Sequence, residues 1–447
     1  MTKCKISVVL AAGLMSVAAL AGCNKKGEDA GEVAKIIAQA QEMDKDDLYK
    51  KAMEEIKGKD FVVVANSSRM KDAAPAWKKY CQEHYNAPDF EFGFSSTQPK
   101  NNQIFAQIKA DVTGKTHNLS MTLIQDGAQI KSKMTKPGYL LNYIPKEWKG
   151  NKETDGEPLA LQSLSKVFCY NNLGGAAYNN CWDYADSVST QFMAPSSEPV
   201  GQNFLYMLTK AEYAATVKAA YDVLSAERKA AIDKVIAADG VDSGIPSLMK
   251  EGGFVEDAKY SLAWIYMFLK KYTRVSDDGP IANNLTAKSN EGAAGLIVYS
   301  KFRSTVESDE VSNKFINIAA YQDGFQGFGG YMYKHYLQIL KTSPFPWTSC
   351  ALTHFMVTEH DGFNPWGKDM GGYSSNPEVQ ATFDHSQDGY VEVKDADGNP
   401  TGEKENLYPC KNDKGYDWWT TQGKLVIEDG EYASSVAAVM SDWIAYL

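Results

Sequence analysis

Residues 60–69 read DFVVVANSSR, and this short stretch decides the fold that we expect. The apolar residues 61–65 form a continuous run with the length of one buried strand. The polar turn that follows consists of Asn66, Ser67, Ser68 and Arg69. Beyond it, residues 70–81 carry an apolar pattern with a helical period. A strand that leads into a helix through a polar turn is the repeating unit of an α/β sheet.

The same unit recurs twice in the next part of the chain. Residues 90–94 read FEFGF and precede Ser95-Ser96-Thr97, and residues 119–124 read LSMTLI and precede Gln125-Asp126-Gly127. These repeats predict an α/β lobe with a largely parallel sheet, in which the polar strand ends share one edge and can bind a ligand. We expect these side chains at that edge: Asn66, Ser67, Ser68, Arg69, Ser95, Ser96 and Asp126. The alternative is that these residues only cap helices.

A second lobe is predicted after a further apolar run at 166–171. Long helical patterns cover residues 211–238 and 256–272. Residues 293–300 and 315–321 then read as two more strands, the first ending in a polar helix start. The return of strand patterns after the helices indicates that the chain crosses between lobes more than once.

Glycine residues mark the second crossing, because residues 325–331 read FQGFGGY and give the backbone the freedom that a hinge or a ligand loop needs. Tyr331, Tyr333 and Tyr336 lie at helical spacing, which favours core or groove-lining positions. The expected division is as follows: 59–167, first part of lobe 1; 168–314, lobe 2; 315–447, hinge return and second part of lobe 1.

The N-terminal sequence predicts export and lipid attachment. Lys3 and Lys5 precede an apolar run at 6–20, and the sequence LAGC at 20–23 closes it. This order is typical of a secretion signal, and the run is too short to span a bilayer. We expect residues 1–22 to be a lipoprotein signal peptide, Cys23 to carry the lipid, and residues 23–58 to form a tether with a short helical segment. The protein would then lie in the cell envelope, outside the cytoplasm and anchored to the membrane.

The charge of the chain restricts its partners. Its formal charge is -10, and removal of residues 1–22 takes away two lysines, which leaves -12. Nucleic acid is therefore not an expected partner. We expect a monomer.

Five cysteines remain beyond Cys23, and their number is odd, so at least one stays unpaired. Cys169 and Cys181 are close in sequence, and a disulfide between them would close a turn-rich loop. The alternative is two buried thiols, because free cysteine packs as a small core residue. No Cys-x-x-Cys spacing indicates zinc, and we expect neither a metal site nor a cofactor.

Several short motifs, in their order along the chain, resemble the extracellular solute-binding proteins of ABC importers, in the group of ferric-iron, phosphonate and polyamine receptors. The motifs are LAGC at 20–23, NSSR at 66–69, QDG at 125–127, LNYIP at 141–145, AGLIVYSK at 294–301, FMVTE at 355–359 and WGKDMGGYSSNP at 366–377. The resemblance implies a two-lobed type 2 periplasmic-binding fold whose lobes close on a small solute about a hinge. It also implies an ABC permease in the cytoplasmic membrane as the partner.

The resemblance also implies that Tyr299 and Ser300 face the solute from the second lobe. Ferric-binding relatives commonly carry two adjacent tyrosines at this place, whereas here the second position is serine. One phenolate with a serine is a poorer donor set for ferric ion, so iron is disfavoured. Tyr299 would then be a wall or a hydrogen-bonding group for an organic solute.

Two other classes of function remain open. An envelope hydrolase has little support, because Gly-x-Ser-x-Gly and His-Glu-x-x-His are absent and the six histidines are scattered. A surface adhesin would share the lipid tether and need no small solute. The sequence DADGN at 395–399 resembles a fragment of a calcium loop but lacks the later glutamate, so we expect a plain hairpin turn.

Overall fold

The computed structural model describes residues 28–447 apart from 100–102, 115, 195–197 and 304–314. The predicted signal peptide and Cys23, the predicted lipidation site, lie outside the described residues. The predicted tether overlaps two helices, α1 (Glu28–Glu42) and α2 (Lys45–Ile56). Within the described ranges, no helix is both long enough and apolar enough to span a bilayer.

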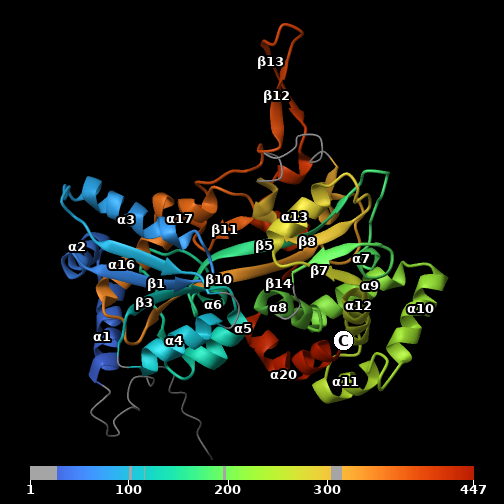
Figure 1. The fold of residues 1–447 in the computed structure, drawn as a ribbon, viewed down its shortest axis with the longest axis horizontal. Coiled ribbons are helices and arrows are strands. Elements are labelled where there is room, and N and C mark those ends of the chain that lie inside the picture. Colours follow the sequence, from blue (N-terminus) through green and yellow to red (C-terminus); the bar gives the residue numbers. More distant parts are fainter. Residues whose placement is uncertain (1–27, 100–102, 115, 195–197, 304–314) are drawn as a thin grey trace, which may run out of the picture.

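One mixed sheet runs through both lobes in the order β2-β1-β3-β10-β5-β8-β6-β7 (Figure 1). In the first lobe, β1 (Asp60–Ala65) lies between β2 (Gly93–Thr97) and β3 (Leu119–Ile124), and the three are parallel, as predicted. The two long strands at the centre, β5 (Ala160–Asn171) and β10 (Gly330–Leu340), are antiparallel to each other. The parallel prediction therefore holds for lobe 1 but not for the crossing between the lobes.

Helices cover both faces of the first lobe. The helix α16 (Pro346–Thr358) is buried along almost its whole length, because its sequence is apolar or uncharged on every side. It packs with the helices of one face: α1, α2, α3 (Met70–His84) and α17 (His360–Gly367). The other face carries α4 (Gln103–Thr113), the short α5 (Gly127–Gln129) and a π-helix (Ile130–Thr135), and β4 (Leu140–Leu141) pairs with the end of β10.

The second lobe contains the other half of the sheet. Its strands beyond β5 are β6 (Gln191–Met193), β7 (Tyr272–Arg274), β8 (Ala294–Val298) and β9 (Ile316–Ile318). One face packs on α7 (Asp183–Asp186), α8 (Pro199–Met207), α9 (Ala211–Asp222), α10 (Ala226–Ala237), α11 (Ile245–Gly252), α12 (Ala258–Lys271) and α20 (Gly430–Tyr446). The other face packs on α13 (Asp278–Thr286) and α19 (Tyr416–Thr421).

Some boundaries differ from the sequence prediction. The helical pattern at 211–238 is two helices, because the side chain of Ser225 accepts a hydrogen bond from Arg228 N and starts α10 as a new helix. The C-terminal α20 contacts α8 and α11 of the second lobe and α5 of the first, so the end of the chain touches both lobes. The strand β14 (Leu425–Ile427) precedes it and pairs with β10.

The tyrosine-rich segment is a strand and not a helix. Tyr331 and Tyr333 lie on one face of β10, as residues two apart in a strand must. A bulge between His335 and Tyr336 shifts the pairing register of β10 with β5. The tyrosines therefore do not follow a period of two along the whole strand, and their spacing resembles that of a helix. Gly330 begins the strand with φ 152°, where a Cβ would lie 2.1 Å from the carbonyl oxygen of Lys166. Glycine therefore lets β10 approach β5 at the crossing.

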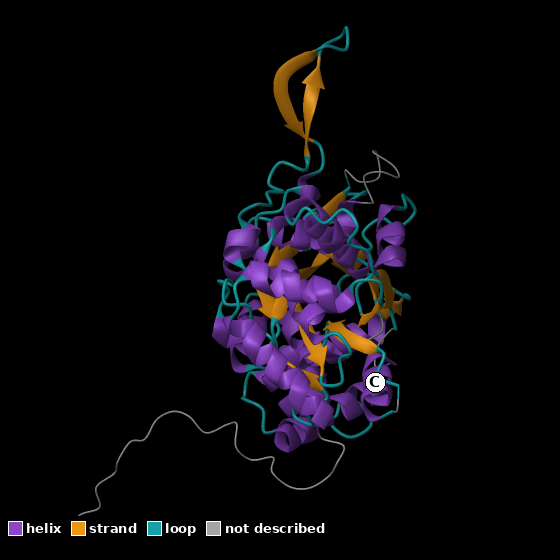
Figure 2. Cartoon of the chain, turned by 90° about the vertical axis from the view of Figure 1, so that its left-hand side faces the viewer, coloured by secondary structure: helices purple, strands orange, loops and turns teal. Residues whose placement is uncertain are grey.

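A hairpin of β12 (Tyr390–Lys394) and β13 (Pro400–Asn406) projects from the body of the molecule (Figures 1 and 2). In its turn, Asp395 Oδ1 accepts hydrogen bonds from Asp397 N at 2.9 Å and Asn399 N at 2.8 Å. The aspartate therefore closes the turn on itself, and the predicted hairpin tip is confirmed. Further short elements are α6 (Lys152–Asp155), β11 (Gly372–Ser374) and α18 (Pro377–Gln380).

Cys169 and Cys181 are both buried free thiols, so the predicted disulfide is wrong and the alternative holds. Cys169 lies on β5 and faces the α13 side of the sheet. Cys181 packs among the helices on the opposite face. Proximity in sequence was misleading because β5 directs Cys169 to one face of the sheet, while Cys181 lies beyond the strand in the core of the opposite face.

Candidate functional site

The loops after β1 and β3 meet where the two lobes join. Asn66 Oδ1 accepts a hydrogen bond from Gln125 N at 3.1 Å. The side chain of Gln125 lies 3.2 Å from His335 Nε2, and His335 Nδ1 lies 2.9 Å from Gln162 Nε2 on β5. The strand ends of lobe 1 are thus tied to both crossing strands. Burial, followed by the charge of Arg69, lowers the pKa of His335 to about 3, so this ring is neutral.

Asp126 joins the two lobes directly. Its carboxylate caps α5 by accepting a hydrogen bond from Gln129 N at 3.1 Å, and it accepts another from Asn203 Nδ2 of α8 at 3.2 Å. The carboxylate is buried, and desolvation raises its pKa despite these donors. Asp126 therefore forms a contact between the lobes, at the edge where the sequence placed it.

The predicted serines have different positions. Ser67 Oγ accepts a hydrogen bond from Trp366 Nε1 at 3.2 Å, so it fixes α17 to the end of β1. Ser68 is exposed beside it and lines a pocket at the lobe junction. Ser95 and Ser96 lie inside β2, at the outer edge of the sheet, and not in a loop after it. The structure does not bring these two serines to the junction.

Tyr299 is in the core of the second lobe and does not line a cleft. Its side chain is fully buried, and its hydroxyl lies 2.8 Å from the hydroxyl of Tyr321. Its ring packs edge-on against Trp419 at 5.4 Å, and a Cβ added at Gly371 would lie 2.6 Å from its Cβ. Ser300, the next residue, is half-buried. The expectation that Tyr299 is a solute wall is therefore wrong for this structure.

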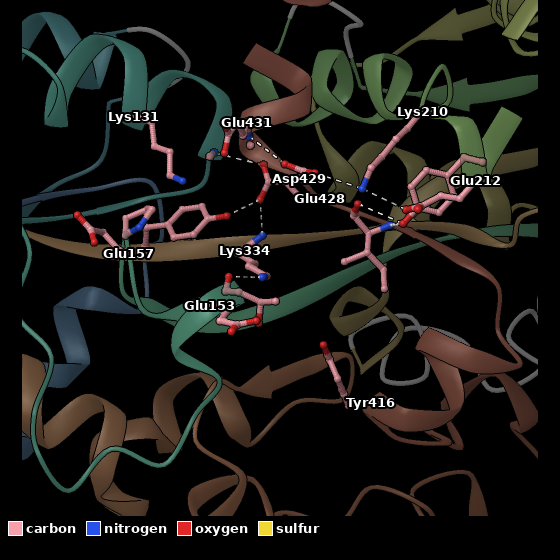
Figure 3. Close-up of a pocket in the computed structure, with 17 residues that line it drawn as sticks. Lys131, Glu153, Glu157, Lys210, Glu212, Lys334, Tyr416, Glu428, Asp429 and Glu431 are labelled. Atoms are coloured by element: carbon pink, nitrogen blue, oxygen red, sulfur yellow. Dashed lines mark hydrogen bonds and ion pairs between the residues drawn. The ribbon is translucent and has the colours of Figure 1, made fainter. Parts of the chain in front are cut away.

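A cavity of about 460 Å³ lies between the lobes on one side of β10, and we call it the interlobe cavity (Figure 3). Its size falls within the range of small-molecule sites. Its charged lining consists of Glu153, Glu157, Glu212, Glu428, Asp429, Glu431, Lys131, Lys210 and Lys334. Lys210 pairs with Asp429 at 3.2 Å, and Lys334 pairs with Asp155 at 2.9 Å. Carboxylates outnumber lysines, so this cavity favours cationic groups.

Glu428 lies buried in the wall of the interlobe cavity (Figure 3). It accepts hydrogen bonds from Lys334 N at 3.0 Å and from Gly127 N at 3.2 Å. Tyr336 Oη donates at 3.1 Å and Asn203 Nδ2 at 3.3 Å. Desolvation raises its pKa to about 7, with the charge of nearby Asp126 adding to the shift. This carboxylate joins β10, lobe 1 and lobe 2.

A second pocket lies at the junction between the end of β1 and the segment after β8, and we call it the arginine pocket. Its volume is about 380 Å³. Its lining residues are Ser68, Arg69, Lys71, Asp72, Arg303, Lys368 and Asp369. The carboxylate of Asp369 forms ion pairs with both guanidinium groups, Arg69 from lobe 1 and Arg303 from lobe 2.

Arg303, Asp369 and Glu428 were not singled out from the sequence. Asp369 and Glu428 lie far in sequence from their lobe 1 partners, Arg69 and Gly127, so no local pattern indicated these contacts. A signal did exist for Arg303, because the chain has only four arginines and this one follows Ser300 by three residues. In the part of the chain that the structure describes, no group of three His, Cys, Asp or Glu residues could hold a metal ion.

No protein-family model matches the chain, and no curated protein matches its sequence. Solved structures do match its fold. Iron-bound HitA from Pseudomonas aeruginosa aligns with a TM-score of 0.50 and 12% identity, over 86% of this chain and 99% of that one. Apo ferric ion-binding protein A from Pasteurella haemolytica gives 0.51 and 9%, over 87% and 98%. The substrate-binding protein of an ABC transporter from Agrobacterium tumefaciens gives 0.51 and 10%, over 87% and 94%.

These alignments cover almost the whole of the known binding proteins, both lobes included. The chain therefore has the two-lobed periplasmic-binding fold that the sequence motifs predicted. At this level of identity the likeness concerns the fold alone, and the solute has to be argued from the side chains of this chain.

Proposed function

We propose that this chain is the solute-binding component of an ABC importer, which captures a small solute between its lobes and delivers it to a membrane permease. The observation that carries the proposal is the junction itself. Two lobes are joined by the crossing strands β5 and β10, and polar and charged side chains from both lobes meet beside them. A ligand held between two such lobes is shielded from water when they close.

The proposal includes the lipid anchor at Cys23, which would hold the protein near the permease outside the cytoplasm. The motif LAGC at 20–23 supports it. We keep the expectation of a monomer, since one chain contains both lobes of the clamp.

We propose a solute other than bare ferric ion. The tyrosine after β8, Tyr299, has its hydroxyl against Tyr321 inside the lobe, and Ser300 follows it. These two positions therefore do not supply the two adjacent tyrosine phenolates that the resemblance to ferric-binding proteins implies. The residues that we retain for solute contact are Asn66, Ser68, Arg69, Asp126 and Ser300.

Small-angle scattering with and without solute tests the clamp. The purified protein is first screened by thermal shift against oxyanions, amino acids, sugars, polyamines and ferric citrate, since a solute that binds the folded state raises the melting temperature. We expect one solute class to stabilise the protein and to reduce its radius of gyration. Stabilisation without compaction would contradict the clamp, and turnover of the solute would favour an envelope hydrolase. If no solute class stabilises the protein, a surface adhesin is favoured.

A further inference from the structure

Two of the four arginines in this chain meet at one carboxylate. Arg69 follows β1 in the first lobe, and Arg303 follows β8 in the second. Both pair with Asp369, whose side chain is 8% exposed. A guanidinium group is a planar fork that matches the oxygens of a carboxylate or a phosphate, which lysine cannot do. A chain that uses lysine almost everywhere thus places half its arginines at the lobe junction.

Arg69 is held in a fixed orientation by lobe 1. Its Nη1 donates to the carbonyl oxygens of Pro365 and Trp366, each at 3.1 Å, at the end of α17. Its side chain is only 20% exposed. Because the guanidinium is already ordered, little further side-chain entropy is lost when an anion binds to it.

The arginine pocket is positive, although the whole chain is acidic. Arg69, Arg303, Lys71 and Lys368 line it against two carboxylates, Asp72 and Asp369. The chain carries a formal charge of -10, and the interlobe cavity of Figure 3 contains more carboxylates than lysines. A local positive pocket on an acidic protein concentrates anions at that place.

We propose that the arginine pocket binds the anionic group of the solute, a carboxylate or phosphate type of oxyanion that bridges Arg69 and Arg303. Asp369 is the internal carboxylate with which this oxyanion competes for the two guanidinium groups. Because the arginines belong to different lobes, an oxyanion that contacts both holds the lobes together. This inference rests on the proposed function and names the solute class for it.

Titration calorimetry at low ionic strength tests the inference with sodium phosphate, sodium sulfate and sodium citrate as oxyanions, and with putrescine and glucose as cationic and neutral probes. We expect at least one oxyanion to bind in the millimolar range or tighter. Arg303→Met should weaken that binding at least tenfold. The matched control is Arg274→Met, which removes an exposed arginine of β7 and the same charge, and should leave the affinity unchanged. If inorganic phosphate binds with an affinity equal to that of citrate, the solute is a free inorganic ion. If only citrate binds, the solute is an organic acid.

Asp369→Asn tests the competition separately. Removal of the internal carboxylate should raise the affinity for the bound oxyanion about tenfold, whereas an unchanged or lower affinity would refute the competition. Circular dichroism and the melting temperature of each variant show whether it is folded, and Arg303→Met, with a side chain 42% exposed, is the safer of the arginine variants. If putrescine or glucose binds and compacts the protein while every oxyanion fails, the inference is wrong and the proposed function stands. If no probe binds or compacts the protein, both fail.

Discussion

The Glu428→Gln substitution tests the electrostatics of the lobe junction. Glu428 accepts hydrogen bonds from four donors and lies near Asp126, a second buried carboxylate. Glutamine has the same shape but cannot ionise. Its amide nitrogen must also face two of the donors, which costs about 1 to 3 kcal/mol at every pH. The pH dependence of the stability difference, and not its absolute value, therefore isolates the ionisation.

The expected magnitude follows from the pKa. Burial raises the pKa of Glu428 from 4.5 to about 7, so the folded protein binds more protons than the unfolded chain between these values. Stability from this group is fully present below pH 4.5 and is lost as the pH rises through 7. The whole shift corresponds to about 3 kcal/mol, most of which falls between pH 5 and pH 8.

His335 acts in the opposite direction in an overlapping range. Its pKa is lowered from 6.5 to about 3, so its contribution is present above pH 6.5 and is lost as the pH falls. The two groups partly cancel in the stability of the unaltered protein. A comparison with Glu428→Gln removes this overlap, because both proteins contain the same histidine.

Urea denaturation followed by tryptophan fluorescence from pH 5 to pH 8 measures the difference. We expect the stability advantage of the unaltered protein over Glu428→Gln to shrink by roughly 2 to 3 kcal/mol across this range. Glu431→Gln is the control, because Glu431 lines the same cavity but is exposed. A Glu428→Gln curve parallel to that of the unaltered protein would show that the carboxylate is not held in a desolvating site.

Three further predictions concern residues that the sequence singled out. Tyr299→Ala should lower the free energy of unfolding by roughly 3 to 5 kcal/mol because it leaves a cavity in the core. Tyr299→Phe should lower it by about 1 kcal/mol because it removes one hydrogen bond. Urea denaturation measures both values, and a loss of solute binding without a loss of stability would contradict the core position of Tyr299. Alkylation of the unfolded, unreduced chain should modify both Cys169 and Cys181, as seen by mass spectrometry, and a protected pair would mean a disulfide. Cys23→Ala should move the folded protein from the membrane to the soluble fraction, and retention after a salt wash would refute the anchor.

The strand-turn-helix units of lobe 1 could be predicted because their information is local. Residues 61–65 are all apolar and form one buried strand, and the polar residues directly after them mark the point where the chain leaves the sheet. The crossing strands were harder, because β10 is buried on both faces and shows no alternation of polar and apolar residues. Its bulge then changed the tyrosine spacing to one that imitates a helix. The period of apolar residues therefore does not identify a strand that is buried on both faces and interrupted by a bulge.

The junction could be predicted only in part. Asn66 and Asp126 follow strands directly, so the topology of a parallel sheet places them at the edge. Tyr299 also follows a strand, but Gly371 and Trp419 of α19 pack against it and bury its ring. Some strand ends are covered by segments from much later in the chain, as residues 369–371 cover Tyr299. The sequence near a strand therefore does not show whether its end is accessible to a solute.

Several contacts between the lobes are polar, and this bears on how the clamp can work. Asn203 bridges Asp126 and Glu428, and Asp369 bridges Arg69 and Arg303. An apolar interface of the same extent would hold the lobes closed whether or not a solute were present, because exposing apolar surface to water is unfavourable. Hydrogen bonds and ion pairs can be exchanged for bonds to water or to a solute at a small net free energy. A polar junction of this kind therefore leaves the choice between open and closed lobes to a ligand that offers better partners to the same groups.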